Sequence, residues 1–229
     1  MLIGAFGGNM FLRENIGTRD KPTFAGESIQ IKVDGENLKE FCHACPVVAD
    51  WDGDGRWDLV LGSGDGSVGW YRNIGSSGKP EFTAREELVA AAADMKFLEQ
   101  NLSAGESAVP GTRAQICVTD YNQDGLLDLI VGDHSDINWS RELSDEENKK
   151  FREIVAEQKE LVNQITEFQE VLYGEKVKVL DEEAKEAKEQ EYDKIADEYM
   201  KLDKAKKEFF KESRSASFIW LYERKPKGG

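Results

Sequence analysis

An internal repeat is the feature of this sequence that most constrains its fold. Residues 60–82 can be laid over residues 2–24 without gaps, and glycines, an Asn-Ile-Gly triplet, a Lys-Pro pair and a phenylalanine coincide. A second match, at a shift of 70 residues, pairs Asp50, Asp54, Gly55, Asp58, Leu59 and Gly62 with Asp120, Asp124, Gly125, Asp128, Leu129 and Gly132. A third partial copy, Trp220-Leu221-Tyr222-Glu223, is similar to residues 11–14 and 70–72. The chain therefore contains at least two full or partial copies of one structural unit, followed by part of a third.

Each copy has the pattern of several short β-strands. In the middle copy, residues 47–49, 59–62 and 68–72 are apolar runs separated by Gly and Asp clusters, and a fourth strand is expected within residues 82–89. Four antiparallel strands in about 60 residues are typical of a β-propeller blade. A β-sandwich is the alternative that the same pattern allows. We also expect Cys117 to be a buried strand residue and residues 133–136 to form a polar turn.

Residues 143–213 have a different composition, rich in Glu, Lys and Ala, with one glycine and no proline. Ser144 and Glu147 have the spacing of a capping box, which starts a helix. Two apolar stripes follow at steps of three and four residues, interrupted at Tyr173, Gly174, Val177 and Val179. The stripes comprise Phe151, Ile154, Val155, Gln158, Leu161, Val162, Ile165, Phe168 and Leu172, then Ala184, Ala187, Tyr192, Ile195, Tyr199, Leu202, Ala205 and Phe209. This pattern predicts an antiparallel helical hairpin inserted within the third copy.

The predicted fold is therefore mainly β: a partial β-propeller of two and a half to three four-stranded blades with an inserted antiparallel α-helical hairpin. Residues 1–142 and 214–229 form the blades, and residues 143–213 form the hairpin. Met1 falls where Leu59 lies in the next copy, so the first copy begins at its second strand. Because closed propellers usually have about four to eight blades, we expect this chain to be the C-terminal part of a longer propeller or a truncated product.

Charge and hydropathy exclude several classes of partner. Thirty Lys and Arg stand against 45 Asp and Glu, which gives a net charge of −15. Nucleic acid and anionic membranes need a basic face, so neither is expected as a partner. No apolar run of about 18 residues is present, so no membrane-spanning helix is predicted. The pair Cys42 and Cys45 leaves a local disulfide or a zinc or redox site open, although a second such pair is missing.

The loop from Asp50 to Asp58 carries acidic side chains at its first, third, fifth and ninth positions: Asp50, Asp52, Asp54 and Asp58. Calcium takes six to eight oxygen ligands from a flexible loop of this kind. Gly55 permits the sharp turn, and the carbonyl oxygen of Arg56 can supply a further ligand. We therefore expect a calcium site here, and a carboxylate turn without metal is the alternative.

The second loop repeats the arrangement with Asp120, Asn122, Asp124 and Asp128, and Leu126 stands where Arg56 stands in the first loop. An amide oxygen coordinates calcium but adds no charge, so the second site is expected to be the weaker one. An EF-hand needs a bidentate Glu at its twelfth position. Leu61 and Val131 occupy that position here, which excludes an EF-hand.

The two carboxylate loops, each followed by a Leu-Val-Leu-Gly or Leu-Ile-Val-Gly strand, resemble the FG-GAP/VCBS repeat family. That family includes the calcium-binding blades of integrin α-subunit propellers and many secreted bacterial proteins. The resemblance covers the chain except the helical block. It implies about two calcium ions, with the matching residues as ligands, and an extracellular or periplasmic location. The helical block is not a general feature of the family, so its role does not follow from the resemblance.

Three functional hypotheses follow. The first is a non-enzymatic, calcium-stabilised module that binds a protein or a glycan. The second is a polysaccharide lyase or hydrolase on a calcium-bearing propeller, although no Ser-His-Asp or Cys-His arrangement is visible around His43 or His134. The third is a scaffold that self-associates through open blade edges or through the helical hairpin.

Overall fold

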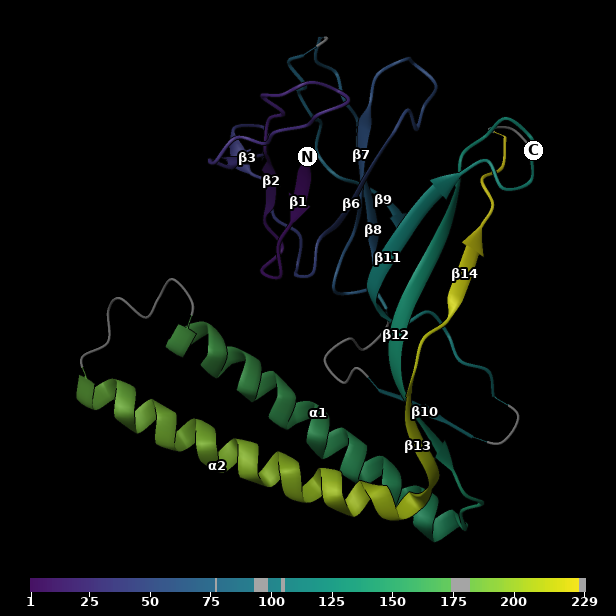
Figure 1. The fold of residues 1–229 in the computed structure, drawn as a ribbon. Helices are drawn as coiled ribbons and strands as arrows, with labels where there is room; N and C mark the ends of the chain where they lie inside the picture. Colours follow the sequence, from purple (N-terminus) through teal and green to yellow (C-terminus); the bar gives the residue numbers. More distant parts are fainter. Residues whose placement is uncertain (77, 93–98, 104–105, 174–181, 227–229) are drawn as a thin grey trace. The chain divides into compact units, whose positions relative to one another are not determined.

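A computed structural model describes residues 1–229 except residues 77, 93–98, 104–105, 174–181 and 227–229 (Figure 1). The described chain is mainly β, with several sheets and two long helices. Its contacts divide it into two compact units. Unit 1 comprises Met1–Leu98, Val109–Ser135 and Ser215–Gly229, and unit 2 comprises Glu99–Ala108 and Asp136–Arg214. The divisions at residues 135 and 214 fall inside two strands.

Unit 1 contains two antiparallel sheets and the antiparallel part of a five-stranded sheet, and these three follow the three copies of the repeat. The first sheet consists of β1 (Leu2–Gly4), β2 (Met10–Leu12) and β3 (Ile29–Gln30). The middle sheet consists, in chain order, of β6 (Cys45–Ala49), β7 (Asp58–Gly62), β8 (Val68–Tyr71) and β9 (Glu86–Val89). In the third sheet, β11 (Thr112–Thr119) and β14 (Ile219–Tyr222) pair with the two edges of β12 (Asp128–Ser140). A small hairpin of β4 (Lys32–Val33) and β5 (Glu36–Asn37) completes the unit.

The strand register reproduces the sequence repeat. The last glycine of the second strand of each copy lies opposite the first apolar residue of the third strand, in the pairs Gly4–Met10, Gly62–Val68 and Gly132–Ile219. The strand predicted after the helical block is confirmed as β14. Its register matches Trp220 to Phe11, as expected. The counterpart of Trp70, however, is Leu221. Trp70 lies opposite Val60, and Leu221 lies opposite Ile130, the residue equivalent to Val60.

Two apolar clusters pack the three sheets of unit 1 face to face. Between the first and middle sheets lie Met10, Leu38, Ala44, Leu59, Leu61, Tyr71 and Phe82. Between the middle and third sheets lie Trp51, Val60, Val68, Val89, Ala114, Leu129 and Val131. The backbones approach so closely that a Cβ on Gly62 would overlap the carbonyl oxygen of Ala114. Among the described residues the sheets form no closed barrel or propeller, so the propeller stays a prediction.

The polar turn predicted at residues 133–136 is wrong, because β12 continues through them to Ser140. Hydrogen bonds explain the continuation. The Asp133 carboxylate accepts the main-chain N–H of Gly111 at 2.6 Å and that of Phe218 at 2.8 Å. Farther along, β10 (Glu99–Leu102) pairs in parallel with residues 136–139 of the same strand. Partners on both edges therefore keep polar residues in an extended conformation.

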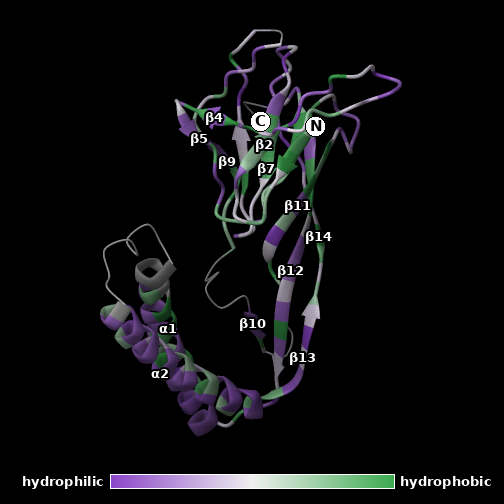
Figure 2. Cartoon of the chain, turned by 60° about the vertical axis from the view of Figure 1, so that its left-hand side comes forward, coloured by the Kyte–Doolittle hydropathy of each residue, from purple (hydrophilic) through white to green (hydrophobic). Residues whose placement is uncertain are grey.

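Unit 2 contains the predicted helices as α1 (Asp145–Tyr173) and α2 (Glu182–Lys206), which lie side by side (Figure 1). The capping box is confirmed: the Ser144 N–H donates to Glu147 Oε2 at 2.9 Å, and the Glu147 N–H donates to Ser144 Oγ at 3.3 Å. Both helices are hydrophilic over much of their surface (Figure 2), while Ile154 and Leu161 of α1 are buried. The predicted break at Gly174, Val177 and Val179 lies outside the described residues.

The end of unit 2 leads back into strand structure. A short 3-10 helix, η3 (Lys207–Phe209), follows α2, and β13 (Phe210–Ala216) then pairs with β12. The aromatic ring of Phe209 packs against that of Phe151 with 5.5 Å between the ring centroids. The buried Lys206 ammonium lies 2.7 Å from Glu99 Oε2, so its charge is paired inside the unit.

Candidate metal centre

The first carboxylate loop connects β6 to β7 in unit 1, and two glycines give it its sharp curvature. Gly53 and Gly55 have φ angles of 76° and 86°, in the left-handed region that glycine enters without steric cost. The second loop, between β11 and β12, has the same backbone: Gln123 and Gly125 have φ angles of 61° and 88°. The two loops therefore share a conformation as well as a sequence pattern.

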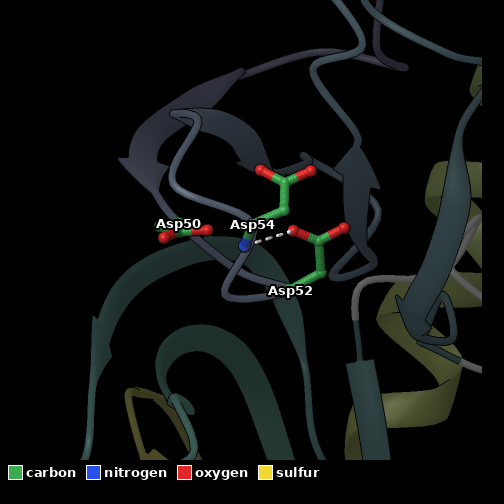
Figure 3. A group of neighbouring side chains, drawn as sticks. All are labelled: Asp50, Asp52 and Asp54. Atoms are coloured by element: carbon green, nitrogen blue, oxygen red, sulfur yellow. Dashed lines mark hydrogen bonds between the residues drawn. The ribbon is translucent and has the colours of Figure 1, made fainter.

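In the first loop, carboxylate oxygens of Asp50, Asp52 and Asp54 lie within 4.8 Å of one another. Figure 3 shows the three side chains on this loop, with the Asp54 main-chain N–H donating to Asp52 Oδ1 at 3.3 Å. The Gly55 N–H donates to Asp50 Oδ2 at 3.0 Å. The other oxygen of Asp50, Oδ1, is buried and has no hydrogen-bond partner among the residues that the structure describes. Three carboxylates on a flexible loop, one of them with an unsatisfied buried oxygen, fit a hard cation such as calcium.

Two arginines already neutralise part of this negative charge. Arg72 Nε lies 2.6 Å from Asp52 Oδ2, and Arg72 Nη2 lies 3.2 Å from Asp54 Oδ2. Arg56 is also ion-paired with Asp54. Burial raises the pKa of Asp54, but hydrogen bonds from the Arg56 main chain and the Arg72 guanidinium, together with both positive charges, hold this pKa below its usual value. A cation at the triad must therefore compete with the arginines for Asp52 and Asp54.

Asp58 lies outside the triad, and its ligand role stays a prediction. Its side chain is fully buried. Oδ1 accepts the Asn73 N–H at 2.7 Å, and Oδ2 accepts the Trp51 N–H at 3.2 Å and the Trp70 Nε1–H at 3.0 Å. The carboxylate therefore connects the first carboxylate loop to the segment that follows β8.

Asp128 repeats this role in the third sheet. Its Oδ1 accepts the Arg224 N–H at 2.8 Å, and its Oδ2 accepts the Tyr121 N–H at 2.9 Å. The Arg224 hydrogen bond is the largest of the effects that hold the pKa of Asp128 below its usual value. The sequence signal for this role is the position itself, since both aspartates are the first residue of a buried strand.

The second loop folds like the first but gathers less charge. The Gly125 N–H donates to Asp120 Oδ2 at 3.0 Å, as Gly55 does to Asp50. The Asn122 amide donates to Asp124 Oδ2 at 3.0 Å, where Asp52 could only accept. At the position expected to offer a carbonyl oxygen, the N–H groups of Leu126 and Arg56 donate to Asp124 and Asp54, respectively. Within the described residues, only the first loop brings three acidic side chains together.

The Cys42–Cys45 pair does not form a second centre among the described residues. Both cysteines are free thiols. Cys42 Sγ lies 3.1 Å from His43 Nδ1, and burial followed by the Asp65 charge raises the pKa of the Cys42 thiol. A raised pKa keeps this thiol protonated, which disfavours metal ligation and nucleophilic chemistry.

Comparison of the chain with models of known protein families and with curated proteins finds no match. In the part of the chain that the structure describes, no helix combines the length and the apolarity needed to cross a membrane.

Proposed function

We propose that this chain is a non-enzymatic calcium-binding module whose sheets act as blades of an FG-GAP/VCBS-type propeller and bind a protein or glycan ligand. The observation that carries the proposal is the triad Asp50, Asp52 and Asp54, with the buried and unsatisfied Oδ1 of Asp50. Calcium suits this site better than magnesium, because magnesium retains several waters and favours fewer protein ligands. Calcium would supply positive charge that fixes the loop between two strands of one blade.

The stacking of three repeated sheets supports the propeller part of the proposal, since propeller blades pack face to face in this way. The second loop would hold a second, weaker ion, because Asn122 replaces an acidic residue. Binding of calcium to the folded state alone stabilises it, by about 2.7 kcal/mol at 100 times the Kd. An extracellular or periplasmic location, where calcium is plentiful, suits a module of this kind.

The test is calcium titration by calorimetry on metal-stripped protein, with thermal unfolding measured in parallel. We expect about two ions to bind and the melting temperature to rise. The variant D52A/D54A should lose the tighter site, D120A/D124A should lose the weaker one, and the exposed Asp20→Ala should keep both. Absence of calcium binding to folded protein at about 10 mM, above the Kd range of about 0.1–1 mM of extracellular calcium modules, would overturn the proposal.

A further inference from the structure

Three equivalent apolar residues in unit 1 differ sharply in exposure. Met10, Val68 and Ile219 each lie opposite the last glycine of the preceding strand of their own sheet. Met10 and Val68 are completely buried, whereas Ile219 is 79% exposed. The same structural position is therefore covered in the first and middle sheets and uncovered in the third.

The covering partner is in each case the next sheet along the chain. Met10 packs with Leu59 and Leu61 of the middle sheet, and Val68 packs with Leu129 and Val131 of the third. The glycines show the same progression. A Cβ on Gly4 would overlap the carbonyl oxygen of Ala44, the residue just before β6, and a Cβ on Gly62 would overlap that of Ala114 in β11. A Cβ on Gly132 would meet nothing closer than 3.8 Å, and that atom is the oxygen of Gln115 in its own sheet.

The uncovered side of the third sheet, which we term the open face, consists of Cys117, Ile130, Ile219 and Leu221. Strand register places Cys117, Ile130 and Leu221 in one row across β11, β12 and β14. Cys117 was expected to be buried; that expectation is wrong, because this residue is exposed on the open face. Leu221 is 43% exposed, while Leu129 and Val131, which alternate with Ile130 along β12, are only 3% exposed. Neighbouring exposed apolar side chains of this kind are consistent with an interaction site.

The first sheet carries the complementary half of the contact. Ile3 corresponds in register to Leu61 and Val131, which are buried against the preceding sheet. No sheet of the described chain precedes the first one, and Ile3 is only partly buried. Met1, the counterpart of Leu59, is 49% exposed. Unit 1 thus has both halves of a contact that it already makes twice internally.

We propose that the open face binds the first sheet of a second copy of this chain, head to tail. The contact would place Ile219 and Leu221 of one copy against Ile3 and Met1 of the other. Two such contacts related by a two-fold axis would form a closed dimer. The first sheet has no strand equivalent to β6 or β11 among the described residues, so this contact is smaller than the internal ones. A small interface between two chains of net charge −15 is expected to be weak and to strengthen as salt screens the repulsion.

The first experiment measures mass by sedimentation equilibrium over about 1–300 µM, a range suited to weak interfaces. We expect concentration-dependent dimerisation that strengthens with salt. Ile219→Lys should weaken it at least about tenfold, because the interface would bury an unpaired charge. The control Ile74→Lys replaces an isoleucine that is 53% exposed outside the open face, and it should have no effect. A monomer throughout the range, or equal effects of the two variants, would overturn the proposal.

A mixing experiment tests the head-to-tail arrangement. Ile3→Glu and Ile219→Lys should each be monomeric, and an equimolar mixture should associate, because one contact is unaltered and the other joins opposite charges. Failure of two folded variants to associate on mixing would exclude this arrangement. If Ile3→Glu does not fold, alkylation of Cys117 in the unmodified chain provides the second readout. Its rate should fall at least about threefold between dilute and concentrated protein as the open face is covered, and a rate independent of concentration would contradict the proposal.

Discussion

The carboxylate of Asp58 accepts the main-chain N–H of Asn73 at 2.7 Å, and Asp128 makes the equivalent bond to Arg224 at 2.8 Å. In each case, the first residue of one strand is hydrogen-bonded to a residue just beyond the end of the neighbouring strand in the same sheet. Asp58 also accepts the N–H of Trp51 from the first carboxylate loop. The geometry of this loop therefore depends on a carboxylate that is not itself part of the triad.

Removal of this carboxylate should be costly. Asp58→Ala would leave the N–H groups of Asn73 and Trp51 buried without an acceptor, and each such loss costs about 1–3 kcal/mol. We expect the free energy of unfolding, measured in urea, to fall by about 3 kcal/mol, a typical sum for a broken buried network. The exposed Asp20→Ala should change it by no more than about 0.5 kcal/mol. Equal stabilities of the two variants would show that Asp58 has no such role.

The glycines of the second strand in each copy provide a matched pair of substitutions. Gly62→Ala would force apart the middle and third sheets at the Ala114 carbonyl, and overpacking of this kind costs about 1–3 kcal/mol. Gly132→Ala adds the same methyl group where the nearest atom is 3.8 Å away, so it should be neutral or slightly stabilising. Thermal unfolding of the two variants in dilute protein checks this difference. A melting temperature lowered equally by both would contradict the assigned packing.

Arg72 should oppose metal binding. It is ion-paired with both Asp52 and Asp54, so a cation that takes these oxygens loses the arginine contacts. Arg72→Gln is therefore expected to tighten calcium binding at the first loop about three- to tenfold. This is the change in affinity expected when one competing ion pair near the protein surface is removed. Calorimetry on metal-stripped protein measures the affinity, and the second site serves as the internal control. Weaker binding in the variant would mean that Arg72 supports the metal site.

The capping box of α1 gives a pH dependence with a defined sign. The Arg141 guanidinium and hydrogen bonds from Ser144 lower the pKa of Glu147 from 4.5 to about 2. Since the folded pKa is the lower one, the stabilisation is present above pH 4.5 and is lost as the pH falls towards 2. Glu147→Gln retains a capping side chain but cannot ionise. The difference in urea midpoint between the native protein and this variant should therefore shrink from pH 6 to pH 2.5, and a constant difference would exclude the charge effect.

The sequence repeat predicted much of unit 1, because recurrence of glycine and aspartate at fixed spacing requires the same turns and strand ends. The strands around Val47, Leu59 and Val68, the conformation of both carboxylate loops and the position of β14 follow from it. The capping box and the apolar stripes likewise predicted α1 and α2, since these signals are local along the chain.

Non-local partners explain what the sequence did not predict. By sequence alone, Asp133 resembles a turn residue. In the structure its carboxylate accepts hydrogen bonds from the main-chain N–H groups of Gly111 and Phe218, which are distant in sequence. Cys117 lies in an apolar strand, but which face of that strand is covered depends on the next sheet. The structural role of Asp58 was missed for the same reason, because Asn73 and Trp70 reach it only after the sheet has formed.

The pairing of β12 with β14 determines the order in which unit 1 can be completed. Gly132 and Ile219 are neighbours in the sheet, although all of the helical block separates them along the chain. Closing so long a loop carries an entropic cost, which prior formation of the local helical hairpin reduces. During synthesis on the ribosome, β14 emerges only after both helices of unit 2. The third sheet is thus the last of the three sheets to be completed. Until then, the apolar cluster between the middle and third sheets is only partly covered, and such surfaces are bound by chaperones.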